Sequence, residues 1–475
     1  MATETARGDG RQAALELQLG SARYKRYFLA VFVTMTAFAY MDRVLMNTLG
    51  EAIKIDLHLT DAQLGMLGGL SIALFYALFA VPSARLAERY RRTGIISIVV
   101  VIWSVMTTLC GVATNFWQLL AARIGIGIGE SGQLATQSLI SDMFPPEKRA
   151  SAFGILNLGV TIGLLFGAIA SGLLVQAFGW RAAFFILGAP GLLLALLIHF
   201  TIKEPPRGFS DGPSTIVDDK PPPLRAVLSL AFSKRSFVHM LIGAAIISVV
   251  GSGVLQFMHP FFVRRFHLSY AEAAAMFGAI NGVTTGIGFL AGGFLSDWLT
   301  KRDKRYYGLV PAIGLLIAMP LFIAGFMQTD WRYALPLLAV PGMFSATYFA
   351  PTYAVAHNIV KPRMRATITA IVSLGSGLTG LAIGPTLAGF ISDWFSSYYY
   401  TSGSFAVQCP GGQAAPGLGP DIAQACTNAA GLGARNALII MASLLAWSAL
   451  HYLLASRSLR KDLPTEPVPS AAMPI

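Results

Sequence analysis

The chain carries twelve apolar runs, each about as long as a helix that crosses a lipid bilayer. An α-helix rises about 1.5 Å per residue, so about 20 apolar residues span the hydrocarbon core. The runs fall at roughly residues 27–48, 61–82, 94–114, 117–143, 150–177, 180–201, 236–260, 270–297, 307–327, 331–359, 364–394 and 433–455. Only 12% of the 475 residues are charged, whereas about 25% is usual in a soluble domain. These features predict an all-α membrane protein with twelve transmembrane helices.

A polar, proline-containing segment divides the predicted helices into two groups of six. The expected order is an N-terminal segment at 1–26, an N-terminal six-helix bundle at 27–201, a linker at 202–235, a C-terminal six-helix bundle at 236–455 with an external loop at 395–432, and a tail at 456–475. The first residues are polar or mixed, so no signal peptide is predicted. The first apolar run is therefore expected to remain as a helix.

The positions of the basic residues predict the orientation. Placing the N-terminus inside puts 27 of the 35 Lys and Arg residues in inside segments. The others lie in outside segments or within helices: Lys54, Arg181, Arg264, Arg265, Arg332, Arg435, Arg43 and Arg123. Cytoplasmic loops carry such an excess, so both termini are expected in the cytoplasm and the net charge of +12 does not indicate a nucleic-acid partner. The short tails and the lack of glycosylation acceptors in outside loops favour a bacterial inner membrane.

The second half of the chain repeats features of the first half at offsets of 209 to 217 residues. Residues 59–63 (LTDAQ) and 268–272 (LSYAE) both read as capping boxes, in which two side chains satisfy free amides at a helix start. Other matched pairs are Glu88 with Asp297, Gly159 with Gly375, Gly163 with Gly380, Gly167 with Gly384 and Gly172 with Gly389. A repeat of this kind predicts two similar six-helix halves.

Several motifs resemble those of the major facilitator superfamily. Residues 84–92 (ARLAERYRR) resemble its signature loop, G-x-L-A-D-R-x-x-R-R, with Ala for Gly and Glu for Asp, and residues 293–297 (GFLSD) resemble the second copy. Residues 123–130 (RIGIGIGE) resemble the fourth-helix signature, and residues 172–181 match the end of the fifth helix. The resemblance covers nearly all of residues 27–455. It implies two pseudo-symmetric six-helix bundles with substrate bound between them near mid-membrane.

The signature loop has a gating role in that superfamily. It latches the cytoplasmic gate by pairing its acid with arginines and a helix end. The resemblance therefore implies gating roles for Glu88, Arg89, Arg92 and Asp297.

Three stretches are most similar to the spinster-like lipid transporters within the superfamily. They are residues 40–43 (YMDR), 123–131 (RIGIGIGES) and 141–146 (SDMFPP). That subfamily handles lysophospholipids and molecules like sphingosine-1-phosphate. The resemblance implies a proton-coupled secondary transporter that moves an amphipathic, lipid-like anion by alternating access.

Four ionisable residues within predicted helices of the first half lack counterparts in the second. Asp42, Arg43, Arg123 and Glu130 correspond to Gly251, Ser252, Ala339 and Ala346. A charge at membrane depth costs at least about 2.5–3.5 kcal/mol, so such groups usually pair or face a water-filled path. Opposite chain directions bring Asp42 and Arg123 to the same outer third of their spans, while Glu130 lies nearer the middle and shares a helix face with Arg123.

Two interpretations of these four residues remain open. In the first, Asp42 and Arg123 form a static ion pair that holds two helices together. In the second, Asp42 and Glu130 exchange a proton while Arg123 and Arg43 modulate their proton affinity, because a neighbouring arginine favours the charged carboxylate. We take the second as the working hypothesis for proton coupling.

Other polar residues are weaker candidates for substrate binding. Six lie in predicted spans expected to border the central cavity: Gln137, Asn157, Gln256, Asn281, Tyr348 and Tyr353. Gln137 continues the face of Arg123 and Glu130 by two further turns. Each of the other five is equally compatible with helix packing.

Several other chemistries find no support in the sequence. The glycine run at 125–129 follows no strand, so helix packing explains it better than dinucleotide binding. No Walker lysine motif, metal-ligand spacing or nucleophile–base pair is present, so we predict no enzyme, no cofactor and no metal. The expected partners are the lipid bilayer, protons and a lipid-like substrate, and the protein is expected to be a monomer. A carrier of a small organic anion or drug is the main alternative, ahead of a membrane enzyme or a channel.

The three cysteines leave one structural question open. Cys110 lies in an apolar run and reads as inert packing. Cys409 and Cys426 flank a Gly- and Pro-rich stretch of the predicted external loop. They would form a disulfide only if that loop faces an oxidising compartment.

Overall fold

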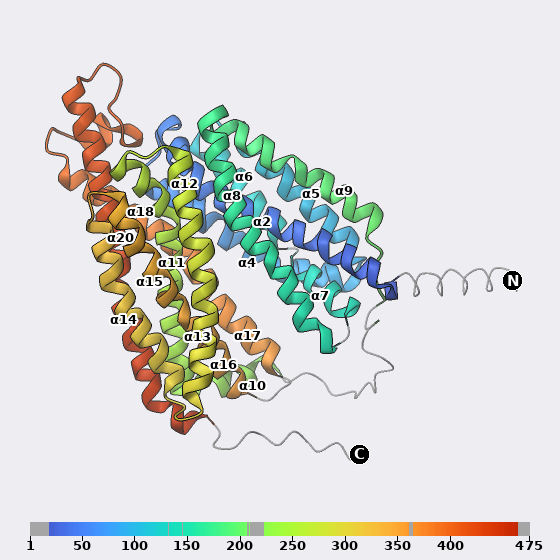
Figure 1. Cartoon of the computed structure of the whole chain (residues 1–475). Helices are drawn as coiled ribbons and strands as arrows, with labels where there is room; N and C mark the ends of the chain where they lie inside the picture. Colours follow the sequence, from blue (N-terminus) through green and yellow to red (C-terminus); the bar gives the residue numbers. More distant parts are fainter. Residues whose placement is uncertain are drawn as a thin grey trace, which may run out of the picture. The chain divides into compact units, whose positions relative to one another are not determined.

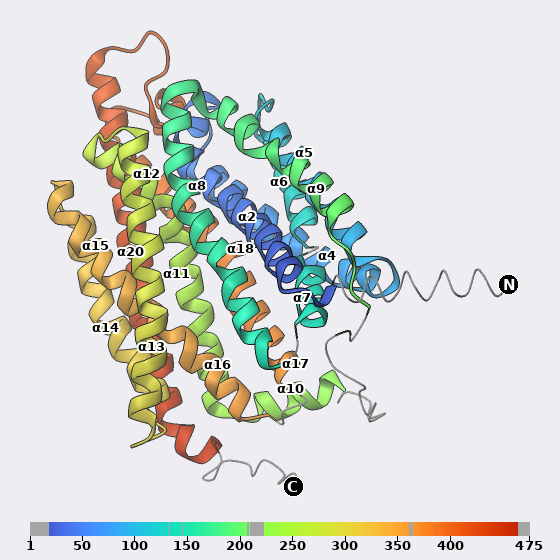
Figure 2. The same ribbon diagram turned by 45° about the vertical axis from the view of Figure 1, so that its right-hand side comes forward.

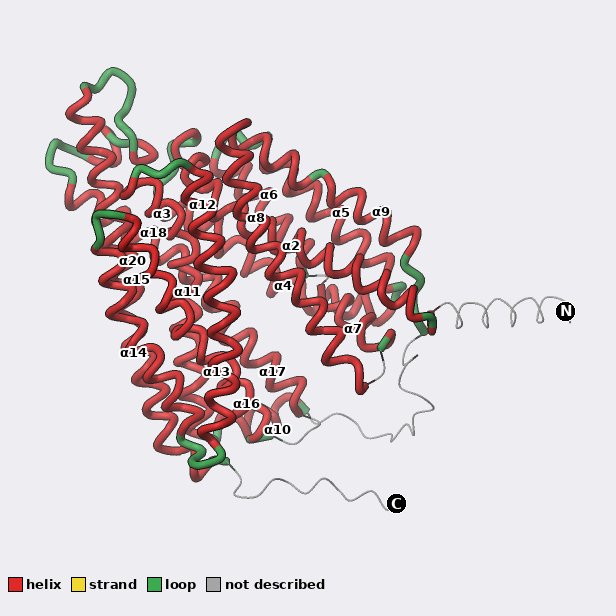
Figure 3. Tube along the Cα trace, viewed as in Figure 1, coloured by secondary structure: helices red, strands yellow, loops and turns green. Residues whose placement is uncertain are grey.

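The computed structural model describes residues 19–131, 133–144, 146–206, 209, 223–360 and 364–463. Within these ranges the regular structure is helical and no strand occurs (Figure 3). The chain separates into two compact units, one made of residues 1–45 and 74–217 and the other of residues 46–73 and 218–475. Residues 46–73 thus belong to the unit that contains the second half of the sequence.

The first unit is built from the helices of the first half. Its elements, with the two helices that continue into the other unit, are α2 (Ala22–Asp56), α4 (Ser71–Arg89), α5 (Arg92–Cys110), α6 (Phe116–Glu130), α7 (Gln133–Met143), α8 (Pro146–Gly188) and α9 (Pro190–Thr201). Gly179 has a left-handed backbone (φ 80°) inside the range of α8, which only glycine adopts readily. This break falls between the predicted fifth and sixth spans.

The second unit contains the remaining helices. They are α3 (Asp61–Gly65), η1 (Met66–Leu70), α10 (Leu224–Phe232), α11 (Arg235–Phe266), α12 (Tyr270–Ala279), η2 (Ile280–Thr284), α13 (Thr285–Thr300), α14 (Tyr306–Met327), α15 (Trp331–Ser345), η3 (Ala346–Tyr348), α16 (Phe349–Asn358), α17 (Arg365–Val372), η5 (Ser373–Leu378), α18 (Thr379–Tyr399), α19 (Phe405–Gln408), η6 (Pro410–Gly412) and α20 (Pro420–Asp462). Helices α11, α14 and α20 run side by side in both ribbon views (Figures 1 and 2).

The predicted spans correspond to helical segments, which confirms the all-α, twelve-span prediction. Among the described residues, eight helical stretches are long and apolar enough to cross a membrane, and one of them, 155–201, contains two predicted spans. The other three predicted spans are divided into shorter elements: π-helical turns lie at η1 and η2, and α6 and α7 are separate helices. The eleventh span also has a π-helical turn at η5, and the tenth has a 3-10 turn at η3. Such interruptions are frequent at functional sites.

Both predicted capping boxes are present. The Thr60 hydroxyl accepts from the Gln63 amide at 3.1 Å, and the Gln63 side chain accepts from the Thr60 amide at 2.9 Å. Ser269 and Glu272 make the same reciprocal pair at the start of α12. The same local sequence device therefore begins the second span of each half.

The matched glycines make equivalent helix contacts in the two halves. A Cβ added at Gly163 of α8 would lie 2.4 Å from the Ala37 carbonyl oxygen of α2, and one at its counterpart Gly380 of α18 would lie 2.7 Å from the Ser248 carbonyl oxygen of α11. Glycine thus lets the fifth span approach the first, and the eleventh approach the seventh, at backbone distance. The structure supports the internal repeat read from the sequence.

Several helix boundaries differ from prediction, most clearly the end of α2 and the start of α20. Helix α2 extends to Asp56, eight residues beyond the predicted end of the first span. Helix α20 starts at Pro420, so much of the predicted external loop 395–432 is helical. Both extensions contain polar residues, so their composition does not mark them as part of an apolar span.

Candidate functional site

Asp42 and Arg123 form a buried ion pair in the first unit. The Asp42 carboxylate on α2 lies 3.5 Å from the Arg123 guanidinium on α6, and the two side chains are 2% and 0% exposed. The Thr107 hydroxyl of α5 donates to the other Asp42 oxygen at 2.7 Å. The contact expected from the helix directions is therefore present, and three helices converge on one carboxylate.

Arg43 and Glu130 form a second ion pair in the same unit. The Arg43 guanidinium donates to both Glu130 oxygens at 2.6–3.2 Å, a two-pronged geometry that strengthens charge-assisted hydrogen bonds. Glu130 is 1% exposed and Arg43 is 32% exposed. The Arg43 guanidinium also lies 4.9 Å from the centre of the Tyr40 ring. From the sequence we predicted that Arg43 modulates the proton affinity of a nearby carboxylate. The structure identifies Glu130 as the carboxylate that Arg43 contacts.

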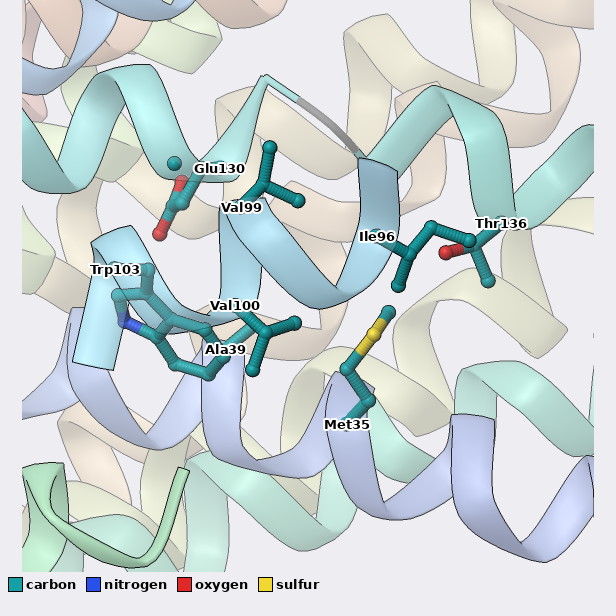
Figure 4. Close-up of a pocket in the computed structure, with 9 residues that line it drawn as sticks. Met35, Ala39, Ile96, Val99, Val100, Trp103, Glu130 and Thr136 are labelled. Atoms are coloured by element: carbon teal, nitrogen blue, oxygen red, sulfur yellow. The ribbon is translucent and has the colours of Figure 1, made fainter. Parts of the chain in front are cut away.

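A small cavity of about 20 Å³ borders Glu130. Its wall comes from α2, α5, α6 and α7: Met35, Ala39, Ile96, Val99, Val100, Trp103, Gly129, Glu130 and Thr136. In Figure 4, Glu130 and Trp103 lie on one side of the cavity and Thr136 on the opposite side. The volume matches that of about one water molecule, so the buried carboxylate has a water-sized space beside it.

The predicted substrate residues of the first half are surface-exposed. Helix α6 ends at Glu130, and Gln137 belongs to the next helix, α7. Gln137 and Asn157 of α8 are both exposed. The substrate-binding roles of Gln137 and Asn157 stay predictions.

The predicted substrate residues of the second half are engaged in local contacts. Gln256 is 1% exposed, with its amide nitrogen 3.5 Å from the Met46 carbonyl oxygen. The Asn281 amide donates to the Phe277 carbonyl at 2.9 Å. The Tyr353 hydroxyl lies 2.9 Å from the Ser373 hydroxyl, while Tyr348 is half-buried in η3. These four residues are not gathered around one described cavity.

Arg92, one of the predicted gating residues, is a buried charge hub. Its guanidinium pairs with Asp142 of α7 and, at 3.1 Å, with Glu204 beyond α9. It also donates to the Pro205 carbonyl at 3.0 Å. One side chain at the start of α5 therefore links three parts of the first unit. The sequence did not anticipate the contribution of Glu204.

The other predicted gating residues contribute less. Arg89 is exposed at the end of α4, with its guanidinium 5.8 Å from the Tyr90 ring centre. The side chains of Glu88 and Asp297 lie outside the described part of the structure. Their gating roles stay predictions.

A second buried charge cluster lies in the other unit and was missed from the sequence. Arg264 of α11 donates to Glu51 at 2.6–2.8 Å and to Asp61 at 2.7–2.8 Å. The Lys54 ammonium lies 2.8 Å from Asp61. All four side chains are at most 6% exposed. We name Glu51, Lys54, Asp61, Arg264 and Asp393 the 51–393 cluster.

Asp393 completes the cluster at the start of α3. Its carboxylate accepts from the Asp61 amide at 2.9 Å and from the Ala62 amide at 2.7 Å. An acid at this position satisfies free amides and complements the positive end of the helix dipole. Residues from the first two spans and from α11 and α18 are thus joined within one compact unit.

Cys409 and Cys426 are joined by a disulfide. The bond connects α20 to the loop that contains Gly411 and Gly412, both of which have left-handed backbones. A Cβ at Gly411 would lie 2.8 Å from the Lys54 carbonyl oxygen. The disulfide-bonded loop therefore packs directly on the end of α2 beside the 51–393 cluster.

The sequence matches the family model of the Major Facilitator Superfamily over residues 28–326. The chain belongs to this superfamily. It also matches the crystal structure of a bacterial homolog of the human lysosomal transporter spinster, in an inward-facing and unoccupied conformation. That match has 32% identity and a TM-score of 0.86 and covers 94% of this chain and 100% of the other. The predicted spinster-like membership is confirmed.

Curated relatives include transporters with different cargoes. An MFS-type efflux pump of Mycolicibacterium smegmatis is 28% identical, over 77% of this chain and 84% of the relative. A sphingosine-1-phosphate transporter of Danio rerio is 26% identical, over 76% of this chain and 75% of the relative. This protein is a multi-pass membrane transporter of the spinster-like type.

Proposed function

We propose that this transporter moves an amphipathic, lipid-like anion by alternating access and couples the movement to protons. The observation that carries the proton coupling is the pair of intramembrane ion pairs, Asp42–Arg123 and Arg43–Glu130. The matching positions of the second half are Gly, Ser and Ala. A symmetric scaffold does not need these charges, and burying them is costly.

Competition between a proton and an arginine provides the coupling. While Arg43 binds Glu130 through both oxygens, the carboxylate is held in its charged form. A proton on Glu130 would cancel the ion pair and release Arg43, whose side chain is partly exposed. The water-sized cavity beside Glu130 supports access for the proton. Asp42, between Arg123 and Thr107, would act as the second acid.

A liposome uptake assay under an imposed pH gradient tests the coupling. We expect Asp42→Asn and Glu130→Gln to reduce gradient-driven uptake at least tenfold and to leave substrate–substrate exchange measurable, since exchange needs no net proton transfer. Gradient-driven uptake by both variants at the wild-type rate with alkaline solution outside would sink the proton-coupled mechanism. It would leave the two ion pairs as static helix contacts.

The proposed cargo is a lysophospholipid or a molecule like sphingosine-1-phosphate. The spinster-like membership and the sphingosine-1-phosphate transporter among the relatives support it. The efflux-pump relative supports the alternative, a small organic anion or drug. Direct binding of lysophospholipids and of small carboxylates to the purified protein separates the two. Saturable binding of carboxylates alone would favour the alternative.

We assign gating roles to the Arg92 hub and the 51–393 cluster. With both termini in the cytoplasm, the start of α5 is at the inner side and the end of α2 is at the outer side. Glu51, Lys54 and Asp61 belong to the first half, whereas Arg264 and Asp393 belong to the second. An outward opening that separates the halves must therefore break the contacts of the 51–393 cluster. The six-helix halves at 27–201 and 236–455 are the proposed moving bodies.

The proposed location is a bacterial inner membrane, with the protein working as a monomer. The excess of basic residues in the inside segments supports this orientation. The disulfide at Cys409–Cys426 supports an oxidising compartment on the outer side.

A further inference from the structure

Two histidines of the second unit face each other across a helix contact. His239 lies near the start of α11 and His451 near the end of α20, and their Nδ1 atoms are 3.1 Å apart. The described part of the structure gives neither imidazole another hydrogen-bond partner. Because 212 residues separate them in the sequence, the local spacing on which the prediction of no metal rested does not reveal the pair.

The distance between the two nitrogens suits a single metal ion. Zinc binds imidazole nitrogens at about 2.0–2.1 Å and favours tetrahedral geometry, so two such nitrogens on one ion lie roughly 3.3 Å apart. The separation in this pair, 3.1 Å, is close to that value. The ring planes meet at 47° with their centroids 5.2 Å apart, so the rings are not stacked face to face. An ion beside the two nitrogens therefore requires little movement of either side chain.

Contacts on both sides of the histidine pair hold the two helices in place. One turn along the helices, the Ser448 hydroxyl of α20 donates to the Gly243 carbonyl of α11 at 2.8 Å. In the other direction, the Ser236 amide of α11 donates to the Asp462 carboxylate of α20 at 2.9 Å. A pair of ligands on fixed helices is ordered before an ion binds, which lowers the entropic cost of binding.

The position of the pair gives access to water. Both imidazoles are partly exposed, and Trp447, whose ring centroid is 6.3 Å from that of His451, is 54% exposed. The two histidines lie close to the inner ends of the predicted spans 236–260 and 433–455. Within the described residues, no group of three or more His, Cys, Asp or Glu side chains could hold a metal. Water must therefore supply the other ligands of an ion bound here.

We propose that His239 and His451 together bind one zinc ion, with water in its remaining positions. Neutral imidazole is a ligand that zinc favours, and it brings no charge that opposes a cation. The bound ion ties the start of α11 to the end of α20. Both helices belong to the second unit, so the ion stabilises that unit and takes no part in the proposed proton coupling. The competing interpretation is a direct hydrogen bond between two imidazoles without a metal.

The test is a zinc titration of the full-length protein, purified in detergent without a polyhistidine tag and freed of metal with a chelator. We expect a saturable rise in Tm with zinc and no rise with magnesium, which prefers oxygen ligands. Loss of a ligand should cost at least as much affinity as loss of a group that orients one, about 10–100-fold. H239Q and H451Q should therefore each bind zinc at least tenfold more weakly than the wild type.

The matched control is H199Q, which removes an exposed histidine of the first unit and should keep the wild-type zinc affinity. X-ray absorption at one equivalent of zinc should show two imidazole nitrogens around the ion in the wild type and fewer in H239Q and H451Q. Equal zinc affinity in these two variants and the wild type would overturn the proposal, because the ion would then bind elsewhere. A wild-type Tm that zinc does not change would also overturn it and leave the hydrogen bond alone.

Discussion

Arg264 is held between two carboxylates in the protein interior, and its removal should be costly. It pairs with both Glu51 and Asp61 at 2.6–2.8 Å. Arg264→Met would leave the buried carboxylates of Glu51 and Asp61 without the guanidinium that balances their negative charge. Breaking a buried pair from one side typically costs about 3–5 kcal/mol. We expect the Tm of the purified variant to fall by several degrees.

A compensating variant shows whether the cost is electrostatic. In E51Q/R264M the Glu51 charge is absent, and Asp61 keeps its contact with Lys54 at 2.8 Å. We expect this double variant to recover at least half of the lost Tm. A double variant as unstable as Arg264→Met alone would attribute the loss to packing.

Asp303 is a carboxylate whose titration lies far from the working pH. Hydrogen bonds from the Arg460 side chain and the Arg305 amide hold the pKa of Asp303 at about 2. A lowered pKa means that this pair stabilises the folded state above the ordinary aspartate pKa of about 4 and loses that effect as pH falls through about 2. Asp303→Asn should leave the pH profile of uptake between 5 and 8 unchanged. A profile shifted by this variant would mean that surface ion pairs, and not only Asp42 and Glu130, set the pH response.

The sequence predicted the Asp42–Arg123 ion pair but not the ion pairs of the 51–393 cluster, for identifiable reasons. Asp42 and Arg123 lie inside apolar runs, so their depth could be read from the chain direction. Glu51 and Asp61 lie at or beyond the predicted helix ends, where a charge needs no partner. The sequence separation of 213 residues between Glu51 and Arg264 leaves no local signal for their contact.

Close helix contacts make specific glycines sensitive to one added methyl group. A Cβ at Gly389 of α18 would lie 2.2 Å from the Asp61 carbonyl oxygen, which is a backbone atom and cannot rotate away. Gly377 of η5 has no atom within 4 Å of an added Cβ. Gly389→Ala should cost about 1–3 kcal/mol through overpacking and lower the Tm. Gly377→Ala should leave the Tm unchanged or raise it slightly, because alanine favours a helix. Equal Tm values for the two variants would contradict the packing geometry.

The Cys409–Cys426 disulfide gives a direct test of the loop predicted to be external. Without reductant, denatured protein from the membrane should react with a maleimide reagent at Cys110 alone. With reductant, all three cysteines should react. The double variant C409S/C426S should lose the difference and unfold at a lower temperature, because a bond that closes a loop of this length contributes about 3 kcal/mol in the chain-entropy view. Three reactive thiols without reductant would show that the bond does not form in the cell.

Element types were more predictable than element ends. Apolar runs located the helices, and capping boxes located two helix starts to the residue. The division of the fourth span and the π-helical turns left no mark on hydropathy, because they change backbone hydrogen bonding and not composition. The polar extensions of α2 and α20 were missed for the converse reason: these residues are helical but not apolar.

At the scale of the molecule, the two halves share a scaffold and differ in chemistry. The matched glycines give both halves the same close helix contacts, while the two intramembrane ion pairs occur in the first half alone among the positions compared. Residues 46–73 of the first half pack in the same compact unit as the second half. The contacts that join the halves in this structure therefore include the 51–393 cluster.

Weakening this cluster should favour an outward-open state. In E51Q/D61N, the buried Arg264 and Lys54 lose the carboxylates of Glu51 and Asp61. Hydration of these two cations would then lower the free energy, and water can reach them only when the cluster opens. A loss of roughly 3 kcal/mol from the closed state would change the population ratio by about 100-fold. Spin labels at Val112 and Tyr333, which are 54% and 67% exposed beside the end of α5 and the start of α15, lie on the proposed outer side and would report the change as a longer distance. Asp303→Asn is the matched control. Asp303 lies just beyond the C-terminal end of α13 and outside the 51–393 cluster, so this variant should leave the distance distribution unchanged. An unchanged distribution in E51Q/D61N would show that the cluster stabilises its own unit without holding the outer side closed.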